Sequence, residues 1–179
     1  MTEPQSLSIL REKNWSDVPS LPGVYWWYFP QTELKRLRIA DFCDLAQLRL
    51  RLSPDNEKVC LYHGMANILA ERIKWHAAQR LTINCLQSCF LSTFRLTLLA
   101  LNDFNYLIGS DHIDNFFDNL SISWQATNSR KEAEALEHVE LQSGHHYPLN
   151  IRGNTRPELT AFVRYLKETR SAYRRQYVS

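Results

Sequence analysis

The sequence is poor in glycine, with only five among its 179 residues. An all-β protein needs many tight turns, for which glycine is the usual residue, so this scarcity argues against an all-β fold. No apolar run approaches the roughly 18 residues that cross a bilayer. The first ten residues, MTEPQSLSIL, have neither the basic start nor the apolar stretch of a signal peptide. We therefore expect no membrane partner and a cytoplasmic location.

Metal-binding cysteine spacing is also lacking. The four cysteines, at positions 43, 60, 85 and 89, form no CxxC pair. Cys85 and Cys89 would share a face of a helix, but no further ligand residue accompanies them. We predict buried free thiols instead of a zinc site, which fits a reducing compartment.

Charge of either sign is not in excess, since the formal net charge is only +2. Such a balance does not indicate nucleic-acid binding, although it can hide a basic face opposite an acidic one. The composition, 44% hydrophobic and 12% aromatic, is that of a globular protein, and the length suits one domain. We expect a single domain over residues 1–179, with its core at about 21–155 and a basic C-terminal helix at about 157–175.

Three segments have strand character. LPGVYWWYF (21–29) is apolar and aromatic and stops at a proline, KVCLYHG (58–64) alternates loosely, and SISWQAT (121–127) alternates apolar with polar residues. They predict a small three-stranded antiparallel sheet. If the first two strands pair, Tyr25 and Tyr62 lie near each other.

Helical segments account for much of the rest, so the fold class is α+β. Asn67 is a candidate cap for a helix to about Arg80, and Ser92 and Thr93 lie within or at the start of a more apolar helix. Further helices are expected at HIDNFFDNL, at SRKEAEALEHVELQ (129–142) and from Pro157, which suits a first helical position.

An inserted segment, residues 31–57, separates the first two strands. It is too long for a hairpin loop and must contain structure of its own, ending in a turn at residues 54–56. Phe42, Leu45 and Leu48 have helical spacing. The insert is either an arm that touches DNA or a solvated surface helix. Its basic residues are Lys35, Arg36, Arg38, Arg49 and Arg51.

Arg72 and His76 are four residues apart and share one face of the predicted helix. Arginine offers forked donors to phosphate oxygens, and histidine transfers protons near neutral pH, so the pair suits a phosphodiester. Taken alone, the spacing is also that of two solvated side chains.

Several motifs, taken in order, resemble those of the GIY-YIG nuclease superfamily. PGVY (22–25) resembles the first motif and LYHG (61–64) the second; Arg72, His76, a glutamate in EAEALEHVEL and the asparagine of PLN follow. RIKWH, STFRLTLLAL, SISWQAT and PLNIRGN resemble a branch of small stand-alone bacterial members that includes restriction endonucleases. The resemblance spans about residues 21–170. Two features depart from it: His63 replaces the apolar residue within YIG, and the two tyrosines are separated by the insert.

The resemblance implies a metal-dependent DNA endonuclease that uses Mg²⁺ or Mn²⁺. Glu137 would be the metal's protein ligand, with Glu134 as the reserve choice. Arg72 would neutralise charge on the phosphate, and His76 would donate or accept a proton. The roles of orienting water and of hydrogen-bonding the phosphate are open between the tyrosines. Asn150 would orient the catalytic loop or the phosphate. The catalytic set is Tyr25, Tyr62, Arg72, His76, Glu137 and Asn150.

Each of these residues has a structural alternative. Tyr25 lies in an aromatic cluster and suits a core, and Asn150 suits the end of a loop. His63 points away from Tyr62 because a strand alternates its faces, and we expect it to serve packing or hydrogen bonding.

The last predicted helix is amphipathic. Its apolar stripe would pack on the core, and a basic edge would contact DNA phosphates without reading sequence, unless that edge is only solvated. The basic residues are Arg164, Lys167, Arg170 and Arg174.

The resemblance favours double-stranded DNA as substrate and a restriction or defence role. A repair or recombination nuclease is the second reading, and a catalytically silent DNA-binding or interaction module of the same fold is the third. One site per chain and two strands to cut would favour a homodimer.

Overall fold

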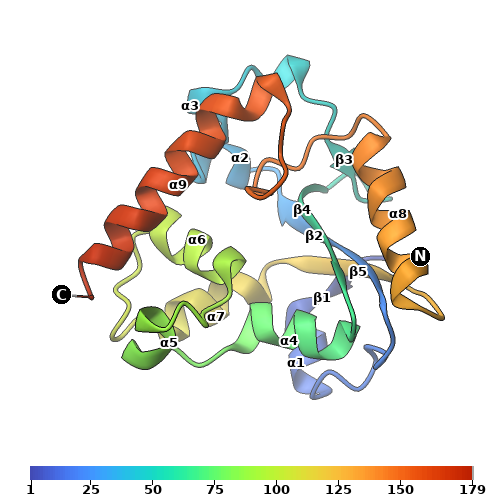
Figure 1. Cartoon of the computed structure of the whole chain (residues 1–179), viewed down its shortest axis with the longest axis horizontal. Coiled ribbons are helices and arrows are strands. Elements are labelled where there is room, and N and C mark those ends of the chain that lie inside the picture. Colours follow the sequence, from blue (N-terminus) through green and yellow to red (C-terminus); the bar gives the residue numbers. More distant parts are fainter. Residues whose placement is uncertain (179) are drawn as a thin grey trace.

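The computed structural model describes residues 1–178. Its strands are β1 (Gln5–Ser6), β2 (Gly23–Pro30), β3 (Arg51–Leu52), β4 (Lys58–Ala66) and β5 (Ser121–Ala126). Its helices are α1 (Leu7–Glu12), α2 (Glu33–Arg36), α3 (Ile39–Phe42), α4 (Leu69–Ala78), α5 (Ile83–Gln87), α6 (Thr93–Leu101), α7 (Ser110–Asp118), α8 (Arg130–Gln142) and α9 (Thr160–Arg175), with short 3-10 turns η1 (Leu45–Gln47) and η2 (Pro157–Leu159). The α+β class is confirmed (Figure 1).

The sheet has five strands in the order β1-β5-β2-β4-β3, all paired antiparallel, so the prediction of three strands was wrong. The three predicted strands form its centre. The additional edge strands, β1 and β3, are two residues long. Two residues are too few to show an alternating pattern, so tertiary pairing decides their conformation.

The central strand β2 packs a different core on each of its faces. Tyr25 and Trp27 belong to the main core together with helices α4, α6 and α7. Trp26 and Tyr28 belong to a smaller core on the opposite face, against which Leu136 of α8 packs. In Figure 1, α9 runs along one side of the molecule and α8 along the other, with β2 and β4 between them.

The insert is folded onto the domain. The ring of Phe42 stacks on Tyr165 of α9 with centroids 4.4 Å apart, and the Arg38 guanidinium lies 5.1 Å above the same tyrosine ring. The predicted helical run through Leu48 was only partly right: α3 ends at Phe42, η1 follows, and Leu48 is extended. The predicted turn is present, with Asn56 in the left-handed region at φ 60°.

Three of the five basic side chains of the insert make ion pairs within the domain. Arg36 pairs with Glu33, Arg38 with Asp41, and Arg51 with Glu140 of α8 at 3.0 Å. These pairs use much of the charge that an arm would offer to DNA.

Two predicted helix starts came out differently. Ile68, not Asn67, precedes α4, and no side chain caps this helix. Ser92 lies at the start of α6 and caps it, since its Oγ accepts a hydrogen bond from the Arg95 amide at 3.2 Å. Pro157 opens η2, which continues directly into α9.

The cysteines are free, but not all are buried as predicted. Cys43 and Cys60 are buried, whereas Cys85 is partly exposed and Cys89 is exposed. Cys89 lies beyond the end of α5 with φ at 60°, so it does not share a helix face with Cys85. Within residues 1–178, no helix combines the length and the apolarity that crossing a bilayer requires.

Candidate active site

A cavity of about 650 Å³ lies beside β4. It is lined by side chains from β2, β4, α4, α6, α8 and α9 and from the loop that follows α8. Five of the six predicted catalytic residues reach it: Tyr25, Tyr62, Arg72, Glu137 and Asn150.

The two tyrosines share one face of the β2–β4 pair. Tyr25 is opposite Gly64, two residues beyond Tyr62, which makes the tyrosines diagonal neighbours with ring centroids 6.4 Å apart. A Cβ atom at Gly64 would lie 2.7 Å from the Tyr25 hydroxyl oxygen. Because the second motif ends in glycine, which has no side chain, space is left there for the Tyr25 ring.

His76 lies behind Tyr25 and does not line the cavity. Its Nε2 is 2.9 Å from the Tyr25 hydroxyl and its Nδ1 is 2.6 Å from Ser92 Oγ. The side chain is 2% exposed, and this burial, together with the positive charge of Arg72, lowers the pKa of His76 to about 3. His76 is therefore a neutral hydrogen-bonding group at physiological pH.

Both tyrosines keep their protons in the resting site. Burial raises the pKa of Tyr25 well above its usual value, and it also raises the pKa of Tyr62. The guanidinium of Arg72 opposes both shifts without reversing them. Two phenol groups thus face the cavity as donors and acceptors of hydrogen bonds.

Arg72 brings a cation to the same space from α4. Its guanidinium lies 4.8 Å from the ring centre of Trp75, a contact that fixes its direction. No carboxylate among residues 1–178 forms an ion pair with Arg72. Its donors remain available to an anionic ligand.

Glu137 is the acidic side chain of the cavity. Burial raises its pKa, which the Met65 backbone amide partly opposes and Glu134 reinforces. Glu134 is exposed, lies outside the cavity and pairs with Arg130 at 2.7 Å. Of the two candidate metal ligands, only Glu137 lines the cavity.

The site fits a metal that takes one protein carboxylate. Glu137 is partly desolvated and has no cationic partner among the described residues. In residues 1–178, no three His, Cys, Asp or Glu side chains converge to form a cage. Mg²⁺ commonly accepts such a site, because it retains several waters and takes further oxygens from substrate phosphates.

The side-chain amide of Asn150 forms two hydrogen bonds with the backbone of His63 on β4. Its Oδ1 accepts a hydrogen bond from the His63 amide at 3.0 Å, and its Nδ2 donates to the His63 carbonyl at 2.9 Å. This double contact joins the loop after α8 to β4. Asn150 therefore holds the loop at the cavity wall.

His63 faces away from the tyrosines, as the strand alternation predicted. Its ring stacks on Trp26 at 5.0 Å, and its Nδ1 is 3.0 Å from the Tyr25 carbonyl. Burial lowers the pKa of His63 to about 4. The contacts are those of packing and hydrogen bonding.

The predicted DNA-binding residues of α9 separate into three environments. Arg170 lines the cavity, and its pKa is lowered by burial and by Arg174. Arg174 donates to the Leu86 carbonyl and is held inside the domain. Arg164 and Lys167 are exposed.

Arg152 was not predicted, although it also lines the cavity. It lies in the PLNIRGN segment, whose resemblance was noted without attention to its arginine. With Arg72 and Arg170, it gives the cavity three arginines beside one glutamate. Such an excess of positive charge suits a polyanion.

A family model described as GIY-YIG catalytic domain matches residues 23–172. The chain belongs to the GIY-YIG family. The match runs from the first residue of β2 into α9 and contains all six predicted catalytic positions. No curated protein and no solved structure matches the chain significantly.

Membership in the GIY-YIG family makes this a nuclease domain and implies a nucleic-acid substrate. Nucleases of the GIY-YIG family generally depend on a divalent metal, in line with the single free carboxylate of the cavity. The tyrosines of the two family motifs are the diagonal neighbours on one face of β2 and β4.

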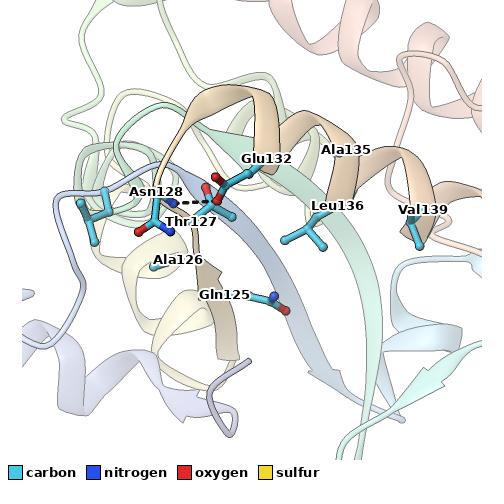
Figure 2. A pocket seen from close by; sticks show the side chains of 9 residues that line it. Gln125, Ala126, Thr127, Asn128, Glu132, Ala135, Leu136 and Val139 are labelled. Atoms are coloured by element: carbon cyan, nitrogen blue, oxygen red, sulfur yellow. Dashed lines mark hydrogen bonds between the residues drawn. The ribbon is translucent and has the colours of Figure 1, made fainter.

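A second cavity of this GIY-YIG domain, about 420 Å³ in volume, lies between α8 and the end of β5 (Figure 2). Glu132, Ala135, Leu136 and Val139 line it, at spacings that place them on one face of α8. Glu137 lies on a different face and lines the first cavity. No predicted site residue faces the second cavity.

Proposed function

We propose that this protein is a metal-dependent endonuclease that hydrolyses phosphodiester bonds of double-stranded DNA. The observation that carries the proposal is the meeting of Tyr25, Tyr62, Arg72 and Glu137 at one cavity rich in arginine. Each brings a function that phosphodiester hydrolysis needs: hydrogen-bonding hydroxyls, a fixed cation and a carboxylate for the metal.

Glu137 would hold the Mg²⁺ or Mn²⁺ ion. When bound, the ion stabilises negative charge on the leaving oxygen. The carboxylate is partly buried on α8 and faces the cavity, so its oxygens are held in place while space remains for water and phosphate.

The remaining side chains bind and orient. Arg72 donates hydrogen bonds to the phosphoryl oxygens, where negative charge increases in the transition state. Tyr25 and Tyr62 orient the attacking water and the phosphate. His76 supports Tyr25 from behind, and Asn150 keeps the loop against β4.

DNA extends from the cavity along α9. Arg170 contacts a phosphate inside the cavity, while the exposed Arg164 and Lys167 contact the backbone further along the same helix. Arg174 contributes by fixing α9 to Leu86. The resemblance to restriction endonucleases supports a defence role, and two chains cut the two strands as a homodimer.

A plasmid assay tests the proposal. We would incubate supercoiled plasmid with the protein and Mg²⁺, and repeat the reaction with EDTA, with Mn²⁺ and with the variants Glu137→Gln and Glu134→Gln. Both glutamates are on α8, but only Glu137 faces the cavity. We expect cleavage by the wild type and by Glu134→Gln, and none by Glu137→Gln or with EDTA.

The products distinguish the roles. Discrete fragments support a restriction enzyme, whereas nicked circles or a smear support a repair nuclease or a less selective one. DNA binding without cleavage under every metal condition would reject catalysis and leave a silent module of the GIY-YIG fold.

A further inference from the structure

A buried chain of hydrogen bonds extends from the cavity into the core. It runs from the Tyr25 hydroxyl to His76 Nε2 at 2.9 Å, and from His76 Nδ1 to Ser92 Oγ at 2.6 Å. Tyr25 and His76 are 2% exposed and Ser92 is fully buried. Water therefore does not reach the inner end, and protein groups must satisfy the polar atoms there.

Ser92 determines the direction of the inner hydrogen bond. Its Oγ already accepts a hydrogen bond from the Arg95 amide, as the cap of α6. A serine hydroxyl has one hydrogen to donate. Among the described residues, His76 Nδ1 is the acceptor in contact with Ser92 Oγ. The hydroxyl hydrogen therefore points to Nδ1, which acts as the acceptor.

The direction at Ser92 fixes the proton on the imidazole ring. A neutral histidine carries one ring proton, so an accepting Nδ1 leaves that proton on Nε2. Burial lowers the pKa of His76 to about 3, which keeps the ring neutral at physiological pH. Nε2 then donates to the Tyr25 oxygen. The opposite tautomer would leave the buried Ser92 hydroxyl hydrogen without an acceptor.

We propose that Ser92 is a positioning residue that holds His76 in the Nε2-protonated tautomer, so that His76 donates to Tyr25 and the Tyr25 hydroxyl hydrogen points away from the imidazole, to the side of Tyr62 and the cavity. Tyr25 then donates to a water or a phosphate oxygen there, and His76 is not the group that accepts the proton of Tyr25. The inference rests on the proposed function, because it defines what Tyr25 does in cleavage.

Nitrogen NMR of protein labelled with ¹⁵N-histidine tests the tautomer without any cleavage assay. The His76 resonances are identified by their absence from the spectrum of His76→Gln. We expect a protonated Nε2 and an unprotonated, hydrogen-bonded Nδ1 at neutral pH. A protonated Nδ1 in the wild type would overturn the inference.

Variants at Ser92 test its role in the reaction. Ser92→Ala removes the donor to Nδ1, and Ser92→Thr retains it. We expect Ser92→Ala to shift both His76 nitrogen resonances and to lower kcat at saturating DNA by on the order of tenfold or more, with KM within about twofold. Ser92→Thr should keep both the resonances and most of kcat.

Loss of the helix cap is controlled with Thr82→Ala, which removes the cap of α5 and leaves His76 untouched. We expect it to lower stability without changing kcat. Ser92→Ala with unchanged resonances and unchanged kcat would overturn the inference. A wild type with a protonated Nε2 that cleaves no DNA would refute the nuclease proposal while supporting the hydrogen-bond assignment.

Discussion

At the scale of single residues, the space around Tyr25 depends on Gly64. An alanine Cβ there would be 2.7 Å from the Tyr25 hydroxyl oxygen and 2.9 Å from its Cζ. We predict that Gly64→Ala displaces the ring, destabilises the fold by about 1–3 kcal/mol and abolishes cleavage. Urea unfolding and the plasmid assay measure the two effects.

Gly153→Ala is the control for this substitution. An added Cβ at Gly153 meets no atom within 4 Å, and the left-handed φ of +71° costs an alanine about 1–2 kcal/mol. Full activity in Gly64→Ala would show that the Tyr25 ring has another place to go.

Two buried histidines predict acid sensitivity. The pKa of His63 is lowered to about 4 and that of His76 to about 3, both by burial, whereas an unfolded histidine titrates near 6.5. The unfolded chain therefore binds more protons below pH 6.5. Stability should be full above that pH and fall below it by about 1.4 kcal/mol per pH unit for each histidine.

The measurement is the free energy of unfolding in urea at several pH values between 7 and 4. His63→Gln should lower the slope against pH by about one proton. Slopes are compared instead of absolute values, since the loss of the stack on Trp26 destabilises His63→Gln at every pH. Equal slopes in the wild type and His63→Gln would contradict a buried, neutral His63.

At the scale of elements, the basic side chains of α9 differ in whether they face solvent or the cavity. Arg164 and Lys167 are exposed, whereas Arg170 faces the cavity. We predict that the double variant Arg164→Gln, Lys167→Gln weakens DNA binding and lowers the slope of log K against log salt by up to about 2, with kcat retained at saturation. Arg170→Gln should instead lower kcat.

A salt titration of DNA binding by fluorescence anisotropy measures this slope. The control is Lys13→Gln, which removes the charge of the exposed lysine that follows α1, and it should leave the slope unchanged. An unchanged slope in the double variant would exclude the outer face of α9 as part of the DNA path.

The sequence predicted the three central strands and the C-terminal helix, because their signals are local. The aromatic run of β2 and Pro157 before α9 each specify conformation within a few residues. The edge strands β1 and β3 depend on partners that lie far along the chain, so no local pattern predicts them. Local patterns also do not predict which side chains of a helix face the cavity.

A sequence pattern places Arg72 and His76 on one face, but it does not tell which of them meets solvent. The structure places Arg72 in the cavity and His76 behind a tyrosine. It also turns Arg170 inward and Arg174 toward Leu86, although both belong to one basic arc. Tertiary packing makes these distinctions.

At the scale of the whole molecule, the cavity depends on the complete fold. Its lining runs from Tyr25 on β2 to Arg170 near the end of α9. The insert contacts both of the long helices that line the cavity. Phe42 stacks on Tyr165 of α9, and Arg51 pairs with Glu140 of α8. Segments from most of the chain therefore contribute to this one cavity. In the proposed function, one such site per chain would cut one strand.

A single site per chain predicts how cleavage depends on protein concentration. If two chains combine to cut both strands, dilution should favour nicked circles, and the rate of linear-product formation should rise with about the square of protein concentration. Nicking by one chain should remain first order. Time courses over a wide concentration range, with analytical ultracentrifugation on the specific DNA, measure both. Mixing wild type with excess Glu137→Gln should trap nicked circles, because mixed pairs hold one active site. Linear product at first order, undiminished by the inactive variant, would show that one chain cuts both strands in turn.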